Sequence, residues 1–213
     1  MIATRNYTGK APDGSSFFWA QTRSCFEHVL FADHIADHGD TNFAHALETC
    51  SMHSAVNALM AVHPNPASVV VGPPGGVGQI RLPDYLMAWC NTPGNFPAIQ
   101  QVLPGVDLST VEVNEYRQAI PLAMLTVFGS PCICVPGQTK DKVIDFLKAG
   151  KAVEVGLVSP KHFVAIVAYD ETTDEFIYVD PDDRRHPDGN WVNARCKYGV
   201  GDGNWSDILV VHG

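Results

Sequence analysis

The sequence has no apolar run long enough to cross a membrane and no apolar leader at its N-terminus. A membrane-spanning helix needs about 18 or more consecutive apolar residues, and no stretch of this chain of 213 residues reaches that length. A signal peptide has a charged segment followed by an apolar one, whereas this chain begins Met-Ile-Ala-Thr-Arg-Asn. We therefore expect synthesis in the cytoplasm, no membrane span and no export signal.

Positive charge is also scarce. Lys and Arg together number 14 against 23 Asp and Glu, which gives a formal net charge of −9, and the basic residues are scattered along the chain. Proteins that bind nucleic acids or anionic membranes need a basic surface to neutralise phosphates. The sequence therefore argues against either as the main partner.

Cysteines are too few and too unevenly spaced to form a disulfide scaffold in a chain of this length. With 46% hydrophobic and 17% charged residues, the chain can bury a core without crosslinks. No repeat, low-complexity tract or charge block marks a linker. We expect a single domain over residues 1–213, with most cysteines reduced and buried. The six are Cys25, Cys50, Cys90, Cys132, Cys134 and Cys196.

The first 150 residues carry mostly helical patterns, in which apolar residues recur every three or four positions. The segment 63–84 differs, because its Pro and Gly content predicts an irregular, exposed excursion, strand-like only at 69–71. In the last helix Thr139 is the expected N-cap and Gly150 the expected stop. Helices are expected over 26–35, after Cys50, and over 83–90, 109–120 and 140–149.

From residue 151 onward the pattern changes to short apolar runs rich in β-branched and aromatic residues, which is typical of strands. Their close spacing predicts antiparallel neighbours, since a parallel crossover needs a dozen or more residues. Helices followed by an antiparallel sheet make an α+β fold. The expected strands are 152–158, 163–169, 176–179 and 208–211.

Cys50 is the strongest candidate for a nucleophile. A nucleophilic cysteine needs a base within hydrogen-bond reach and a stabilised thiolate. If Thr49 caps the helix, the sulfur lies at the positive end of the helix dipole. If the helix begins near Thr41 or Asn42, that argument fails. On a helical wheel Cys50 lies with Ser54, Asn57 and Ala61, roughly opposite the apolar face, so these small neighbours would leave room for substrate.

His162 and Asp180 are the candidates for the base and for the residue that orients it. His162 opens the run 163–169 after a Ser-Pro-Lys turn, and Asp180 closes the next run. A hairpin between the two strands returns their far ends to the same place. Asp180 would then hold the imidazole tautomer and stabilise the imidazolium, as the third member of a catalytic triad does.

Two stretches carry a resemblance to a known family. TCSMHSAVNALM and KAVEVGLVSPKHFVAIVAYDETTDEFIYVDP resemble the papain-like C39-like and NlpC/P60-like cysteine peptidases. The resemblance implies a papain-like fold, in which N-terminal helices, the nucleophile helix among them, pack on a C-terminal antiparallel β-sheet. It also implies Cys50 as nucleophile, His162 as base and Asp180 as orienting residue, with no cofactor and no metal.

The chain departs from that family at two positions. Relatives often have Gly after the cysteine, where this chain has Ser51, and Gln about six residues before it, where this chain has Ala44. The oxyanion donor is therefore open. The backbone N–H of Cys50 could supply one hydrogen bond, and the side-chain candidates are His45, Asn42 and Gln21, with His45 or Asn42 preferred.

Other residues allow different interpretations. Cys25 is a reserve nucleophile, and Asp170 a rival for orienting the histidine. His34 and His38 are spaced for zinc but lack the glutamate that a zinc-protease motif requires, which favours an exposed helix surface. Cys132-Ile-Cys134 is typical of a strand, and the glycine-rich 72–78 segment lacks the Lys-Ser/Thr of a phosphate loop.

Peptidoglycan stem peptides are the preferred substrate, by the resemblance. Because no signal peptide is visible, the enzyme would reach the envelope or periplasm through phage lysis or a specialised secretion apparatus, and an antibacterial effector of that kind would need an immunity protein. The alternatives are a protein-directed cysteine protease, a non-catalytic peptide-binding module of the same fold, and an acyltransferase that uses the same thioester chemistry.

Overall fold

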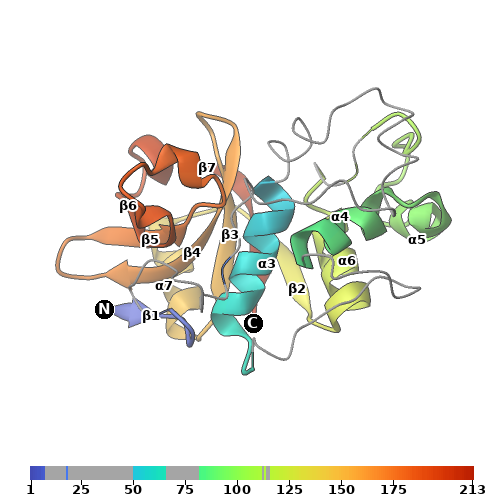
Figure 1. Ribbon diagram of the computed structural model, residues 1–213. Helices are drawn as coiled ribbons and strands as arrows, with labels where there is room; N and C mark the ends of the chain where they lie inside the picture. The colour runs from blue at the N-terminus through green and yellow to red at the C-terminus, as the bar shows by residue number, and fades with distance from the viewer. Residues whose placement is uncertain (8–17, 19–49, 66–81, 112, 114–115) are drawn as a thin grey trace.

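A computed structural model describes residues 1–7, 18, 50–65, 82–111, 113 and 116–213 (Figure 1). In this part of the chain, seven strands form one antiparallel sheet in the order β2-β7-β3-β4-β5-β6, and β1 pairs with β4. Because β5 occupies the other side of β4, β1 extends the side that β3 occupies. The strands are β1 Ile2–Ala3, β2 Cys132–Pro136, β3 Ala152–Leu157, β4 His162–Asp170, β5 Glu175–Val179, β6 Ala194–Cys196 and β7 Trp205–His212.

The four apolar runs of the second half are strands, as predicted: they form β3, β4, β5 and β7. Short turns connect β3 to β4 and β4 to β5, and both pairs are antiparallel. The Cys132-Ile-Cys134 segment is also a strand, in β2. The sequence patterns missed β1 and β6, which have two and three residues. The α+β class is confirmed.

Helices cover both faces of the sheet (Figure 1). Ala61 of α3 packs in one cluster with Ala152 of β3, whereas Val143 of α7 packs in another with Val153. Since consecutive residues of a strand point to opposite faces, α3 and α7 lie on opposite sides. The helices are α3 Cys50–Val62, α4 Leu82–Asn91, α5 Phe96–Ile99, α6 Ala119–Phe128 and α7 Lys140–Lys148.

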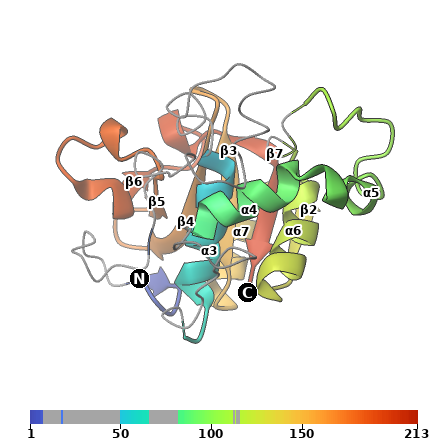
Figure 2. The ribbon, with the colours of Figure 1, turned by 45° about the vertical axis from the view of Figure 1, so that its right-hand side comes forward.

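Helix α3 is buried on every side, which corrects the prediction that one of its faces lies open. Ser54, Asn57 and Ala61, the expected small-residue face, are each 0% exposed. The helix lies between the sheet and α4, which runs beside it (Figure 2). Small side chains here let the helix approach its neighbours closely, so any room for substrate has to lie at its Cys50 end.

The helix expected over 109–120 is wrong in its position, because the observed helix is α6, Ala119–Phe128. The Asp107 carboxylate accepts hydrogen bonds from the backbone N–H and the hydroxyl of Ser109. This local bonding favours a turn over a helix. Pro121 then falls in the first turn of α6, where its missing N–H costs nothing.

The other helix predictions divide into two groups. Helix α4 matches the one expected over 83–90, and α7 the one over 140–149. The Thr139 side chain caps α7 by accepting from the Lys142 N–H at 3.3 Å, and Gly150 follows with φ of 74°. The helix expected over 26–35 and the strand-like 69–71 lie outside the described residues. Within the described ranges, no helix has the length and apolarity to span a bilayer.

Candidate active site

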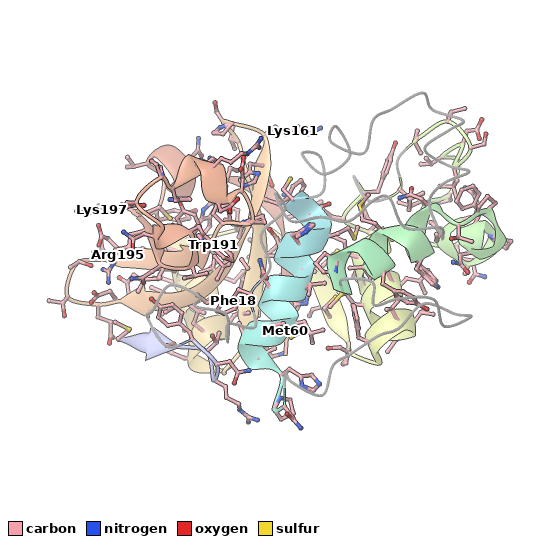
Figure 3. The ribbon with its side chains drawn as sticks, in the orientation of Figure 1. Phe18, Met60, Lys161, Trp191, Arg195 and Lys197 are labelled. Carbon is pink, nitrogen blue, oxygen red and sulfur yellow. The ribbon has the colours of Figure 1, made fainter. Side chains whose placement is uncertain are left out.

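The packing of α3 on the sheet brings Cys50 to His162, the first residue of β4. The Cys50 thiol acts on the His162 ring through hydrogen bonding and through its charge, and both effects raise the pKa of His162. Cys50 is a free, partly exposed cysteine, and the His162 side chain is only 8% exposed. Figure 3 shows Lys161, the neighbour of His162, at the end of the molecule where α3 begins, and Met60 near the other end of that helix. Thr49 lies outside the described residues, so its capping role stays a prediction.

The carboxylate of Asp180 holds the other side of the His162 ring. The Oδ1 atom of Asp180 is 2.6 Å from Nε2 of His162, and Asp180 itself is fully buried. The register of the β4–β5 hairpin, in which Ala165 pairs with Val179, produces this contact. Since Nε2 is bonded to Asp180, the ring nitrogen that remains for the Cys50 thiol is Nδ1. The carboxylate therefore fixes the imidazole and leaves Nδ1 as the ring nitrogen available to the thiol.

Two residues that the sequence patterns did not single out hold the second oxygen of Asp180. Nη1 of Arg185 donates to Oδ2 at 2.8 Å, and Nε2 of His186 lies 2.9 Å from the same atom. The backbone N–H of Asp182 donates to Oδ1 at 2.9 Å. With both oxygens fixed, the carboxylate cannot rotate away from His162. The sequence signal was the charged run Asp-Asp-Arg-Arg-His directly after Asp180-Pro181.

Arg185 is itself held by Asp202. Its Nη2 donates to both carboxylate oxygens of Asp202 at 2.9 Å, and Tyr178 donates its hydroxyl to the same carboxylate at 2.6 Å. The indole of Trp205 donates to the backbone carbonyl of Asp202 at 2.9 Å. The loops after β5 and β6 are therefore tied to each other and to strands β5 and β7 of the sheet.

The electrostatics of the pair favour an ionised carboxylate and a protonated imidazole. Burial lowers the pKa of His162, but hydrogen bonds with Asp180 and Cys50 outweigh burial and raise that pKa to about 9. Burial raises the pKa of Asp180, but the hydrogen bonds with His162 and His186, and the charge of Arg185, outweigh it and hold the pKa well below its usual range. A protonated His162 would stabilise a negative charge on the Cys50 sulfur.

The rival orienting residue, Asp170, is far from His162 along the same strand. It is the last residue of β4, of which His162 is the first. Its carboxylate pairs with Arg195 at 3.1 Å, and Arg195 lies well away from Lys161 in Figure 3. The hypothesis that Asp170 orients His162 is therefore wrong.

The remaining candidates include residues outside the described ranges: Gln21, Cys25, His34, His38, Asn42, His45 and the 72–78 segment. Within those ranges, no group of three or more His, Cys, Asp and Glu side chains is arranged to hold a metal ion. Burial raises the pKa of Cys90 and of Cys196 to about 12. These two thiols are therefore poor nucleophiles.

A comparison with protein families adds independent information. Residues 88–206 match the model of the Peptidase_C39 like family. The match includes His162 and Asp180 and begins downstream of Cys50. No curated protein matches the chain.

Proposed function

The chain belongs to the Peptidase_C39 like family, and on this premise we propose that it is a cysteine peptidase or amidase with Cys50 as nucleophile, His162 as general acid and base, and Asp180 as orienting residue. The family supports cysteine peptidase activity in general. The assignment of roles to these three residues is our own.

One observation carries the proposal: the Cys50 thiol acts on the ring of His162 and raises its pKa, and the carboxylate of Asp180 lies 2.6 Å from Nε2 of the same ring. A catalytic cysteine needs a base within hydrogen-bond reach, and that base needs a third group to fix its tautomer. Arg185 and His186 in turn fix the third group. A cysteine that serves only in packing does not need a histidine beside it or a carboxylate that orients this histidine.

In the proposed reaction, the Cys50 thiolate attacks the carbonyl carbon of an amide, and the carbonyl oxygen takes up negative charge. The His162 imidazolium gives its proton to the departing amine, so the C–N bond breaks and a thioester remains. His162, now neutral, takes a proton from water, which attacks the thioester. The C–S bond breaks, and the acid product and the thiolate–imidazolium pair are formed.

We further propose that the arrangement is papain-like, with the nucleophile on α3 and the base and orienting residue on the sheet. Within this proposal the backbone N–H of Cys50 is one oxyanion donor, and His45 or Asn42 supplies the second. The chain would form one domain over residues 1–213.

The proposed substrate is the peptide stem of bacterial peptidoglycan. This proposal is supported by the resemblance of the sequence to the C39-like and NlpC/P60-like cysteine peptidases, which include cell-wall hydrolases. We propose delivery to the envelope by lysis or by a specialised secretion route, with an immunity partner in the producing cell.

The labelling of Cys50 by iodoacetamide tests the nucleophile. We expect fast labelling below pH 7, where an unassisted thiol with a pKa of about 8.5 reacts slowly, because His162 stays protonated up to pH of about 9. In His162→Ala, labelling at pH 6.5 should fall by about 100-fold. Peptide mass spectrometry would give the rates, and the buried Cys90 and Cys196 serve as internal controls.

Equal, slow labelling of Cys50 in the wild type and in His162→Ala would overturn the catalytic proposal. The protein would then be a peptide-binding module of the same fold, since such a module needs no thiolate.

Digestion of isolated peptidoglycan tests the substrate. We expect the wild type to release soluble peptide fragments and to create new free amino groups, because amide hydrolysis exposes one amine for each bond cut. Chromatography with mass spectrometry would identify the products and the bond. Active-site labelling without any change in muropeptides would leave the cysteine peptidase in place and reject the cell wall as substrate, which would favour a protein-directed protease.

A further inference from the structure

A second cationic group lies next to the candidate active site. Arg117 precedes α6 and reaches over the sheet, where its guanidinium lies 4.6 Å from the ring centroid of Phe163. Phe163 directly follows His162 on β4. On its other side, Nη1 of Arg117 donates to the backbone carbonyl of Ile208 on β7. The guanidinium is thus fixed over the strand ends that carry the candidate base.

The sheet beneath Arg117 is shaped to admit the guanidinium. A Cβ added to Gly156 would overlap Nη2 of Arg117 and would come within 2.9 Å of its Cζ. Gly156 pairs with Phe163, and the next pair along the two strands is Leu157 with His162. The missing side chain at Gly156 therefore lets a cation rest on the backbone one residue pair from the candidate base.

Arg117 has hydrogen-bonding capacity to spare. A guanidinium has five N–H donors, and with the described residues its side chain makes one hydrogen bond, to Ile208. Glu154, the acid whose charge acts most on Arg117, is buried and makes no side-chain hydrogen bond with the described residues; its Oε2 lies 3.7 Å from Nε2 of His212. Burial lowers the pKa of Arg117, whereas the charges of Glu154, Cys134 and Cys50 raise it.

We propose that Arg117 is a substrate-binding residue that recognises a free carboxylate next to the scissile amide. Planar carboxylates match the fork of a guanidinium and form two parallel hydrogen bonds with it. A partly buried cation that forms no ion pair with an acid among the described residues gains most from such a ligand, because its own desolvation has already occurred. The inference rests on the proposed peptidase and narrows its substrates to peptides that carry a carboxylate beside the bond to be cut.

The test compares two alkylating agents of nearly equal size at Cys50. In both reactions the thiolate attacks the CH₂ carbon and iodide leaves, but iodoacetate carries a carboxylate where iodoacetamide carries a neutral amide. In the wild type we expect the iodoacetate rate to saturate with concentration, because the reagent binds before it reacts. In Arg117→Gln saturation should disappear and the ratio of iodoacetate to iodoacetamide rates should fall about tenfold or more.

Arg117→Lys is the matched control for charge. Lysine keeps the positive charge but cannot form the paired hydrogen bonds. If Arg117→Lys keeps both the saturation with iodoacetate and the wild-type ratio of iodoacetate to iodoacetamide rates, positive charge alone is sufficient. The proposal that Arg117 binds the carboxylate through two hydrogen bonds would then be wrong. Gly156→Ala gives an independent check, since its methyl group should displace the guanidinium and lower the ratio in the same direction.

A second measurement uses only the wild type. N-acetylglycine should protect Cys50 from iodoacetamide, whereas N-acetylglycinamide should not. If N-acetylglutamic α-amide protects Cys50 and N-acetylglycine does not, the subsite binds a side-chain carboxylate. If only N-acetylglycine protects, the subsite binds a main-chain carboxylate. No protection by either, with fast iodoacetamide labelling, would overturn the subsite and leave the peptidase intact. Slow iodoacetamide labelling in the wild type would instead reject the peptidase and the subsite with it.

Discussion

Cys50→Ala is expected to reduce hydrolysis by a factor on the order of 10⁶, the scale found when the nucleophile of a triad enzyme is removed. Without the sulfur no thioester forms, and His162 has no thiol from which to take a proton. The same loss is expected for Cys50→Ser, because a serine hydroxyl is far less acidic than a thiol and His162 remains its base. The measurements are kcat/KM on the stem peptide that the digestion experiment identifies as a substrate, and a thermal unfolding curve of each protein.

The unfolding curve separates chemistry from folding. Cys50 is partly exposed, so its replacement by alanine creates no large cavity and should leave the midpoint nearly unchanged. Cys25→Ala is the control for the reserve nucleophile and should keep full activity. Activity that survives in Cys50→Ala and is lost in Cys25→Ala would show that the nucleophile was assigned to the wrong cysteine.

The proximity of His162 and Asp180 could be predicted from the sequence because the hairpin that joins their strands follows from connector length. Four residues, 171–174, separate β4 from β5, and so short a connector allows only an antiparallel hairpin. In a hairpin the first residue of one strand and the residue after the other strand lie side by side. The contact therefore follows from chain order, without knowledge of tertiary packing.

The residues that hold Asp180 could not be predicted in this way. Arg184, Arg185 and His186 follow one another in a charged run that is typical of a solvated loop. Arg185 turns inward because a 3₁₀ turn, Asp183–Arg185, begins at Asp182, whose side chain accepts the Arg184 N–H. The inward direction of Arg185 depends on the position of Asp202, which lies 17 residues further along the chain. Local patterns contain no information of that kind.

The burial of α3 is a similar case. Its sequence shows an apolar face and a small polar face, and the pattern predicts that the polar face is open. The structure covers this face with the sheet, where Ala58 and Ala61 pack against Ala165 and Val167. A helix rich in small residues can be buried all round, because small side chains let neighbours approach from every side.

Asp180→Asn is expected to lower kcat by 10²–10⁴-fold, roughly the contribution of an oriented general acid and base. The amide can present its NH₂ group to Nε2 of His162, which favours the wrong tautomer. It also removes the charge that raises the pKa of His162. Burial lowers the pKa of His162, and without the Asp180 charge less counteracts this effect. The pKa of His162 should therefore fall from about 9. The alkaline limb of the kcat/KM profile should move to lower pH in parallel, and NMR titration of the His162 ring would measure the shift directly.

The sign of the stability change follows from the same pKa values. The pKa of Asp180 is lowered in the folded state, so its ionised form stabilises the protein above the unfolded pKa of about 3.9, and this contribution is lost as the pH falls. Asp180→Asn should therefore cost about 2 kcal/mol at pH 7 and progressively less in acid. For His162 the sign is opposite: its contribution is complete below pH of about 6.5 and is lost as the pH rises through about 9.

Asp202→Asn is the matched control, because it makes the same chemical change at a carboxylate that binds Arg185 but not His162. It should reduce stability and leave the alkaline limb in place. If both variants moved the limb equally, His162 would be responding to the general charge of the loops and not to its contact with Asp180. If neither moved it, Asp180 would be a structural carboxylate, and the imidazole would have to be oriented by Cys50 and the surrounding sheet alone.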